Sequence, residues 1–351
     1  MIGIDLFAGV GGMSTGAAQA GIDVKFAVES DKFAANAYRK NHPHCEIFVD
    51  DIRRLSSEKI KQIPHGSDGT VVFGGPPCQG FSYSNTRTRG VHNENNWLFE
   101  DFARVVEIWQ PDFVVFENVR GIIDTAKGLI LKAIIDRFDQ LGYMLSYGIL
   151  NALNFGVPQK RSRFFLIGSR TNKKIELPRR AVSSSPTVQD AIADLPRLVN
   201  GAAKSWLPYS DIPPSIYAKK LRKGLSGCSS HLVTKNNDEI IRRYRFVPPG
   251  GNWENIPPKM MKNYKDRHRC HTGIYYRLRY DRPSIVIGNY RKNMLIHPSE
   301  DRGLSVREAA RIQSFSDSYE FAGSIGFQQQ QVGNAVPPQL AKAVFGQLHV
   351  R

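Results

Sequence analysis

The feature that most constrains the fold of this chain is an alternation of short β-branched or aromatic runs with amphipathic helical patterns, which continues up to about Gly168. Apolar residues from Leu98 to Trp109 and from Leu129 to Leu141 recur at helical spacing between such runs. This alternation predicts an α/β, doubly wound domain, in which a parallel sheet carries helices on both faces. The expected strands are Ile2–Phe7, Val24–Val28, Ile47–Val49, Val71–Phe73, Phe113–Phe116 and Phe164–Ile167.

The pattern changes near Ser183. Ser183–Pro186 is typical of a linker, and the stretch that follows is rich in proline and hard to divide into regular elements. A helix with a capping pattern is expected from Ser305 to about Ser314. Single hydrophobic cores stop growing at roughly 250–300 residues, so this chain of 351 residues is expected to form two domains. We assign residues 1–185 plus 328–351 to the first domain and residues 186–327 to a second, smaller, irregular domain.

The charge of the chain is concentrated in one segment. The formal net charge is +16, and the segment from Arg197 to Arg302 holds 21 Lys and Arg against 8 Asp and Glu, a net charge of +13. A solvated basic surface is one explanation. An excess so concentrated, and interleaved with aromatic residues, favours a nucleic-acid partner.

The four cysteines (Cys45, Cys78, Cys228 and Cys270) are few and scattered, so we expect a reducing compartment and no disulfides. Cys228 with His231, and Cys270 with His271, lack the paired Cys-x-x-Cys spacing of a zinc site, so no metal is expected. The chain opens on a strand without a charged leader or a long apolar stretch. We therefore expect neither secretion nor membrane insertion.

A glycine-rich loop, Asp5–Gly12, follows the first expected strand and precedes a helix. The glycines allow a tight turn, and a helix N-terminus favours an anionic group. Glu29 closes the second strand about 20 residues later, where an acid can hold ribose hydroxyls. Asp51 follows the third strand and can accept a hydrogen bond from an adenine amino group. The loop departs from Gly-x-Gly-x-x-Gly at Ser14, but together these features predict a nucleotide-type cofactor.

A second group of reactive residues lies at later strand ends. Cys78 follows two prolines and stands among glycines directly after the strand Val71–Phe73, which makes it a poor core residue and a good nucleophile. Glu117 ends the strand that begins at Phe113. Arg161 and Arg163 are two residues apart, so in an extended segment their side chains point the same way. Two parallel cations suit a carbonyl oxygen or a phosphate.

In order and spacing, these blocks resemble the DNA cytosine-5 methyltransferase family of the bacterial or phage restriction-modification type. Arg307–Gln313 and Gly333–Pro338 add to the resemblance, which covers the chain except for about Pro196 to Ser299. It implies a Rossmann-like, S-adenosylmethionine-dependent catalytic domain, completed by the last segment from Gln331, and a target-recognition domain. It also implies that Cys78 attacks carbon 6 of cytosine and that Glu117 contacts the ring at N3. Arg163 would hold the cytosine carbonyl, and Arg161 would support the catalytic groups.

The resemblance further assigns a set of residues to the S-adenosylmethionine pocket: Phe7, Gly9, Gly11, Gly12, Glu29, Ser30, Asp51, Ile52, Pro77, Leu98, Asn334 and Ala335. The implied substrate is a cytosine flipped out of double-stranded DNA. Ser82–Asn95, with Arg87 and Arg89, is expected to close over the flipped nucleotide, and the region from about Ser205 to Met294 to read the bases. The implied setting is the bacterial cytoplasm or nucleoid, where a monomer protects host DNA beside an independently acting restriction endonuclease.

Two alternatives stay open at this point. One branch of the family modifies transfer RNA, but it typically carries a Cys-Phe-Thr block that this chain lacks. A catalytically inactive DNA-binding regulator would not be expected to retain Cys78, Glu117 and Arg163. A dinucleotide-dependent oxidoreductase is disfavoured because it leaves the Pro-Pro-Cys turn unexplained.

Overall fold

The computed structural model describes residues 1–77, 97–171, 173–210, 212–213, 215–261, 272–288 and 290–349. The chain forms two compact units. The first contains Met1–Phe155, Ser162–Ala181 and Val336–Arg351, and the second contains Gly156–Arg161 and Val182–Ala335. The chain therefore passes from one unit to the other four times, and residues 328–335 belong to the second unit.

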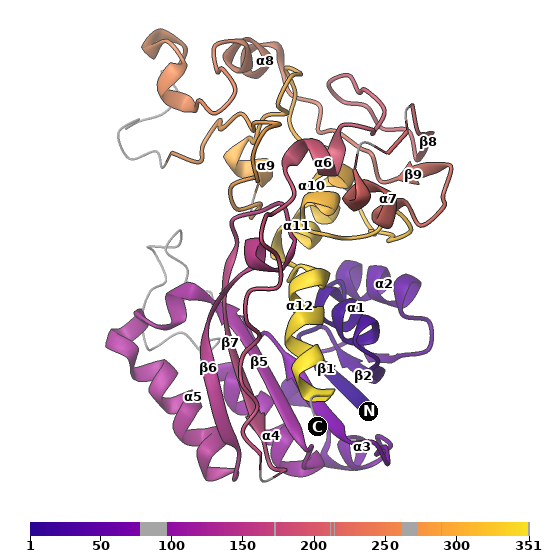
Figure 1. Ribbon diagram of the computed structural model, residues 1–351, viewed down its shortest axis with the longest axis vertical. Coiled ribbons are helices and arrows are strands. Elements are labelled where there is room, and N and C mark those ends of the chain that lie inside the picture. The colour runs from indigo at the N-terminus through magenta and orange to yellow at the C-terminus, as the bar shows by residue number, and fades with distance from the viewer. Residues whose placement is uncertain are drawn as a thin grey trace. The chain divides into compact units, whose positions relative to one another are not determined.

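The first unit is built on a seven-stranded sheet of order β3-β2-β1-β4-β5-β7-β6 (Figure 1). β1 to β5 pair in parallel, whereas β7 is antiparallel to both β5 and β6. The strands are β1 (Ile2–Leu6), β2 (Asp23–Val28), β3 (Glu46–Phe48), β4 (Thr70–Gly74), β5 (Phe113–Val119), β6 (Met144–Asn151) and β7 (Ser162–Ser169).

The parallel sheet expected from the sequence is corrected here: the sheet is mixed, because β7 is antiparallel to its two neighbours, and β6 was not among the expected strands. β6 and β7 are joined by residues 152–161, which hold one 3-10 turn (Ala152–Phe155) and no crossover helix. Parallel neighbours need a long crossover, so this short connection leaves the two strands antiparallel. The six expected strands are all present.

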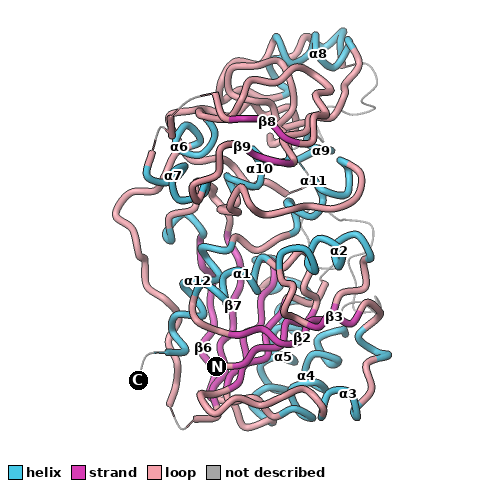
Figure 2. The backbone as a smooth tube through the Cα atoms, turned by 90° about the vertical axis from the view of Figure 1, so that its right-hand side faces the viewer, coloured by secondary structure: helices cyan, strands magenta, loops and turns pink. Residues whose placement is uncertain are grey.

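Helices cover both faces of this sheet (Figure 2). On one face, α3, α4 and α5 pack on the sheet through a continuous core in which the rings of Phe102, Phe116 and Phe138 meet edge to face. On the other face lie α1 and α12, and the Phe345 ring of α12 contacts the Phe73 ring of β4. The helices are α1 (Gly12–Gln19), α2 (Lys32–Asn41), α3 (Ser57–Lys61), α4 (Leu98–Trp109), α5 (Leu129–Gln140) and α12 (Pro338–Phe345).

The N-terminal and C-terminal ends of the chain meet where α1 crosses α12 (Figure 1). At Gly16, an added Cβ would lie 2.4 Å from the Cβ of Ala341 and 2.7 Å from the carbonyl oxygen of Pro338. The two backbones can approach this closely only because residue 16 has no side chain. The C-terminal segment is therefore an integral part of the first unit.

The second unit consists mainly of loops with short helices and a small two-stranded antiparallel sheet, β8-β9 (Figure 2). Its centre is α10, in which all seven residues are buried. Ser305 and Glu308 form a capping box at the start of this helix, and Arg302 pairs with Glu308 at 2.7 Å. The elements are α6 (Val188–Ile192), β8 (Trp206–Pro208), α7 (Ile216–Arg222), β9 (Gly227–Ser229), α8 (Asp238–Arg245), α9 (Tyr290–Asn293), α10 (Val306–Ile312) and α11 (Ile325–Asn334).

Candidate active site

The carboxyl ends of the parallel strands bring most of the expected site residues of the first unit to one edge of the sheet. In register, Leu6 at the end of β1 lies beside Val28 of β2 and Gly74 of β4, and Gly74 lies beside Phe116 of β5. The segments that leave these strands are therefore neighbours. Open α/β sheets bind their ligands at this edge.

The glycine-rich loop after β1 adopts the conformation that its composition predicts. Phe7, Gly9 and Gly11 have φ values of 60°, 56° and 85°. The backbone N–H of Gly9 donates to Oε2 of Glu29 at 2.7 Å, and the N–H of Asp31 donates to Oε1 of Glu29 at 2.7 Å. The carboxylate at the end of β2 thus fixes the loop after β1. Burial raises the pKa of Glu29 above its ordinary value.

Two glycines of this loop have different surroundings. A Cβ on Gly9 would meet nothing within 4 Å, so the backbone borders open space there. A Cβ on Gly11 would lie 2.5 Å from Nε2 of His42, so this glycine is required by close packing as well as by its φ. Gly11 is the N-cap residue of α1, so no N-cap side chain accepts a hydrogen bond from the first N–H groups of this helix. Gly12, the first residue of α1, is buried.

Ser14, which breaks the glycine pattern, has a structural role that the sequence did not reveal. Its hydroxyl donates to Oδ2 of Asp5 at 2.6 Å and lies 2.7 Å from the hydroxyl of Tyr38. Burial raises the pKa of Asp5 to about 8. The loop therefore rests on a buried carboxyl that is mostly protonated at neutral pH, and a serine rather than a glycine is needed to bond it.

The third strand end is held by two arginines. Asp51 caps the 3-10 turn Ile52–Arg54, and its bond with the side chain of Arg53 lowers its pKa to about 2. Arg104 of α4 donates to the carbonyl oxygens of Ile52 at 2.7 Å and Leu55 at 2.9 Å. Arg104 was not expected from the sequence, because backbone carbonyls leave no sequence signal for the side chain that binds them.

The turn after β4 is anchored to the end of β5. Nδ2 of Asn118 donates to the carbonyl oxygen of Pro76 at 3.2 Å. A Cβ on Gly75 would lie only 2.5 Å from Oε2 of Glu117. The glycine thus makes room for the buried carboxylate, and the amide fixes the prolines that lead into Cys78. Cys78 itself and the expected loop Ser82–Asn95 lie outside the described residues.

Glu117 of β5 and Arg163 of the neighbouring strand β7 form an ion pair. Val119 lies opposite Arg163 and Glu117 opposite Phe165, so Glu117 and Arg163 are diagonal neighbours on one face. Nε of Arg163 is 3.0 Å from Oε1 of Glu117. The structure thus brings together two of the residues that were assigned to chemistry on the target base.

Arg161 has a different environment from Arg163. It lies in the second unit, is fully buried, and donates to the carbonyl oxygens of Ile287, Gly333 and Ala335 at 2.9 Å each. These last carbonyls belong to the C-terminal end of α11, where backbone acceptors lack partners within the helix. Arg161 therefore fixes the segment that holds Asn334 and Ala335.

Most of the remaining expected cofactor residues lie near strand and helix ends of the first unit. Ser30 and Pro77 are exposed, Ile52 is buried, and Leu98 is the half-buried first residue of α4. Asn334, in the second unit, is exposed at the end of α11.

Comparison with known proteins places the chain in a family. The family model for C-5 cytosine-specific DNA methylases matches residues 1–349. The chain belongs to this family. It is 35% identical to the type II methyltransferase M1.HphI of Haemophilus parahaemolyticus over 97% of this chain and 84% of that protein. It is 33% identical to the type II methyltransferase M.DdeI of Desulfomicrobium norvegicum over 97% and 86% of the two chains.

The fold of this family member is shared with solved structures. One of them, described as a DNA modification methyltransferase encoded within a prophage of E. coli, has a TM-score of 0.81 and 27% identity, covering 99% of this chain and 98% of that chain. The expected methyltransferase class and its α/β fold are thus confirmed. Membership also implies S-adenosylmethionine as the methyl donor and DNA as the substrate.

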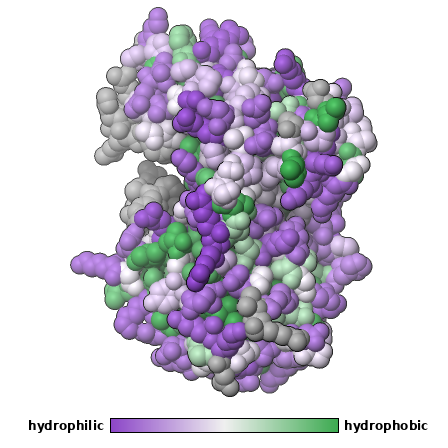
Figure 3. Space-filling model, viewed as in Figure 1, coloured by the Kyte–Doolittle hydropathy of each residue, from purple (hydrophilic) through white to green (hydrophobic). Residues whose placement is uncertain are grey.

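The structure qualifies the charge argument made from the sequence of this methyltransferase. Among the described residues of the basic segment, four arginines are buried and each pairs with an acid, so these pairs add no net charge to the surface. The pairs are Arg222 with Asp194, Arg243 with Glu239, Arg277 with Asp301, and Arg302 with Glu308. Lysines such as Lys204, Lys219 and Lys235 are exposed. Hydrophilic residues dominate the face of the molecule shown in Figure 3.

In the described part of the chain, no group of three or more His, Cys, Asp or Glu side chains could hold a metal ion. That part also contains no helix both long and apolar enough to cross a bilayer.

Proposed function

We propose that this methyltransferase modifies carbon 5 of a cytosine flipped out of duplex DNA, through a transient bond between the sulfur of Cys78 and carbon 6. The observation that carries the proposal is the anchoring of the Pro-Pro-Cys turn on β5. Asn118 bonds the Pro76 carbonyl, and Gly75 packs against the Glu117 carboxylate. A nucleophile that follows this turn starts from a backbone fixed next to a buried acid.

The chemistry explains why these residue types are needed. Carbon 5 of cytosine is too electron-poor to attack a methyl sulfonium unaided. Addition of the Cys78 thiolate to carbon 6 yields an enamine with a nucleophilic carbon 5, which divides one difficult step into easier ones. Glu117, acting as an acid, donates its proton toward N3 and so offsets the negative charge that develops on the ring. After methyl transfer, a base removes the carbon 5 proton, the thiolate leaves and the ring regains its aromaticity.

Arg163 has a double role in this proposal. Its Nε lies 3.0 Å from Oε1 of Glu117, so it orients the acid. A guanidinium has further N–H donors in a fixed plane, and in the proposal one of them holds the cytosine carbonyl oxygen.

The residues at the first three strand ends fit S-adenosylmethionine, which supplies an electrophilic methyl group when bound. The α1 N-terminus has no side-chain cap, so its backbone N–H groups suit the cofactor carboxylate. The Glu29 carboxylate suits the ribose hydroxyls, and open space lies over Gly9. Phe7, Gly11, Gly12, Ser30, Asp51, Ile52, Pro77 and Leu98 complete the proposed set in the first unit.

Asn334 and Ala335 are proposed to join this set through the end of α11. Arg161 then acts indirectly, because its guanidinium binds carbonyls and is fully buried. We assign it as a positioning residue that fixes the shape of this segment.

The second unit is proposed to recognise the DNA target, with residues 186–327 as the target-recognition domain. Extrusion of a base costs a few kcal/mol, and exposed cations bound to phosphates can offset that cost. The likeness to type II methyltransferases over most of their length supports a role in a restriction-modification system. The proposed setting is the bacterial cytoplasm or nucleoid, with the enzyme acting as a monomer beside an independent endonuclease.

The test combines sequencing and substitution. Base-resolved sequencing of DNA from cells that express the protein should show 5-methylcytosine in one sequence context. In purified form, Cys78→Ala should lose methyl transfer to duplex DNA while still binding it. Undiminished turnover by the variant, or methylation of transfer RNA in preference to DNA, would refute the proposal.

A further inference from the structure

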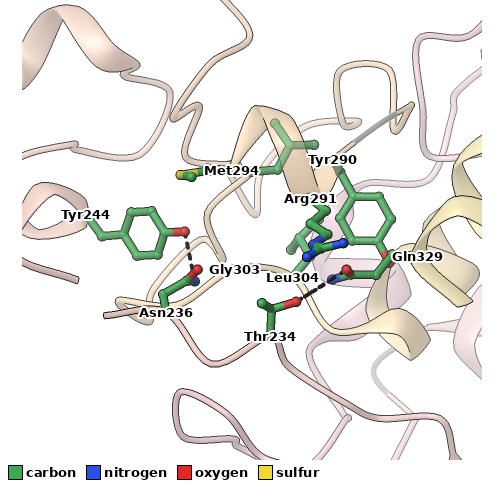
Figure 4. Close-up of a pocket in the computed structure, with 10 residues that line it drawn as sticks. Thr234, Asn236, Tyr244, Tyr290, Arg291, Met294, Gly303, Leu304 and Gln329 are labelled. Atoms are coloured by element: carbon green, nitrogen blue, oxygen red, sulfur yellow. Dashed lines mark hydrogen bonds between the residues drawn. The ribbon is translucent and has the colours of Figure 1, made fainter. Parts of the chain in front are cut away.

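The second unit contains a small pocket between α9, α11 and the segments around residues 234–236 and 303–304 (Figure 4). Apolar side chains such as Met294 and Leu304 form part of its wall. The polar side chains that line it are Thr234, Asn236, Tyr244, Tyr290, Arg291 and Gln329.

Each of these polar side chains can donate a hydrogen bond, and none is acidic. Two internal bonds orient them: Nε2 of Gln329 donates to Oγ1 of Thr234 at 3.0 Å, and Nδ2 of Asn236 donates to the Tyr244 hydroxyl at 3.2 Å (Figure 4). An amide nitrogen carries two N–H groups, so each amide keeps a second donor.

The Tyr290 hydroxyl is the group that points to a ligand. Its residue is 2% exposed, and the hydroxyl oxygen has no hydrogen-bond partner among the described residues. Burial raises the pKa of Tyr290 well above its ordinary value, so the hydroxyl keeps its proton. A buried polar group without a partner costs about 1–3 kcal/mol. A ligand that accepts its proton would remove that cost.

The charge of the pocket selects the ligand. Arg291 is exposed and forms no ion pair with any described residue. Its guanidinium lies against the first turn of α11, since an added Cβ on Gly326 would be 2.8 Å from its Nη1. The side chains that line the pocket include one cation and several neutral donors but no carboxylate, a set that suits an anion.

We propose that this pocket binds a backbone phosphate of the DNA substrate. The inference rests on the proposed function, and it assigns this contact to Tyr290, Arg291 and Gln329. Hydroxyl, amide and guanidinium groups of this kind bind phosphate oxygens at protein–DNA interfaces, where they fix the register of the protein on the duplex. The pocket also lies within the unit that holds the basic segment.

The test uses two neighbouring glutamines of α11. Gln329→Glu places a negative charge of nearly the same shape in the pocket, whereas Gln330→Glu makes the same change at an exposed neighbour. We expect Gln329→Glu to weaken binding of a cognate duplex about 10-fold, as for a lost bond to a charged group. It should also reduce the slope of log affinity against log salt by about 0.9, the value for one phosphate. Gln330→Glu should change the slope by less than about 0.3.

Tyr290→Phe is the second variant, because it removes only the hydroxyl. It should weaken DNA binding about 3-fold or more with the thermal midpoint unchanged or raised, since the orphan donor is gone. Equal effects of the two glutamine variants, or wild-type affinity in both Gln329→Glu and Tyr290→Phe, would overturn the assignment.

Two controls separate the possible failures. One outcome is that inorganic phosphate, at constant ionic strength, stabilises the wild type but not Gln329→Glu, while the two proteins show the same slope of log DNA affinity against log salt. The pocket then binds free phosphate, and the DNA assignment is wrong. If the wild type methylates DNA and the variants bind like wild type, only the pocket assignment fails. If the wild type neither binds nor methylates DNA, the proposed function fails as well.

Discussion

Substituting Gly75 with Ala tests whether the position of the Glu117 carboxylate controls catalysis. The backbone of Gly75 is not in the left-handed region, so an alanine is not strained by its own φ. Its Cβ, however, would lie 2.5 Å from Oε2 of Glu117, whereas ordinary contacts begin at 3.4 Å. The carboxylate must therefore move by about 0.9 Å or take the turn with it. Either movement disturbs the 3.0 Å pair with Arg163.

A displacement of about 1 Å at a reacting group can cost 100-fold in rate, or about 2.7 kcal/mol. We expect kcat for methyl transfer to fall by about that factor, and the Kd for S-adenosylmethionine from titration calorimetry to stay within about 2-fold. Gly346→Ala is the matched control, because its Cβ would meet nothing within 4 Å. Full activity of Gly75→Ala, with a crystal structure showing the displaced carboxylate, would refute the reasoning.

Two further predictions concern the support of the cofactor pocket and the core of the second unit. Arg104→Gln removes the hydrogen bonds to the carbonyl oxygens of Ile52 and Leu55. The KM for S-adenosylmethionine should therefore rise about 10-fold, while kcat stays within about 2-fold of the wild-type value. Arg137→Gln is the control, because it alters surface ion pairs with Glu100 and Glu107, and an equal rise in its KM would contradict the prediction. Burial lowers the pKa of His231 from 6.5. The folded protein therefore binds fewer protons at this side chain than the unfolded chain does. The free energy of unfolding consequently falls as the pH drops below about 6.5. Between about pH 6.5 and pH 5, the free energy of unfolding measured with urea should fall less in His231→Gln than in the wild type. An identical fall in the two proteins would count against the prediction.

The sequence predicted those parts of the fold that have a strong local pattern. The buried strands β4 and β5 contain the continuous apolar runs Val71–Phe73 and Phe113–Phe116, as is usual for strands covered on both faces. β6 is an edge strand in which only Ser146 and Leu150 are buried, and Gly148 interrupts its pattern. Such a strand has little periodicity to detect, and its absence from the expectation also hid the antiparallel pairing of β7.

Part of the candidate site could be predicted from the sequence for a similar reason. Acids near the carboxyl ends of strands, such as Glu29 and Glu117, are placed by the topology at one edge of the sheet, and this is the edge where ligands bind. The partners of Arg104 and Arg161 are backbone carbonyls far away in the chain, which carry no side-chain signal. The sequence spacing of Arg161 and Arg163 suggested parallel cations, but each has its own partners in a different unit.

The basic segment shows why a charge count needs a structure. Arg277 is buried, and its guanidinium donates to the carbonyl oxygens of Tyr244, Val247 and His297 as well as to Asp301. Such an arginine stabilises irregular backbone and is not available to DNA. The segment therefore contains fewer cations for DNA than its 21 Lys and Arg suggest.

The central claim is that the sulfur at position 78 bonds to the target pyrimidine. The direct measurement is incubation of the protein and S-adenosylmethionine with a cognate duplex that carries 5-fluorocytosine at the target site, followed by denaturing electrophoresis and peptide mapping. Because fluorine replaces the proton that must leave carbon 5, the reaction should stop with the DNA attached to Cys78. Absence of a covalent complex, or attachment at another residue, would contradict the account.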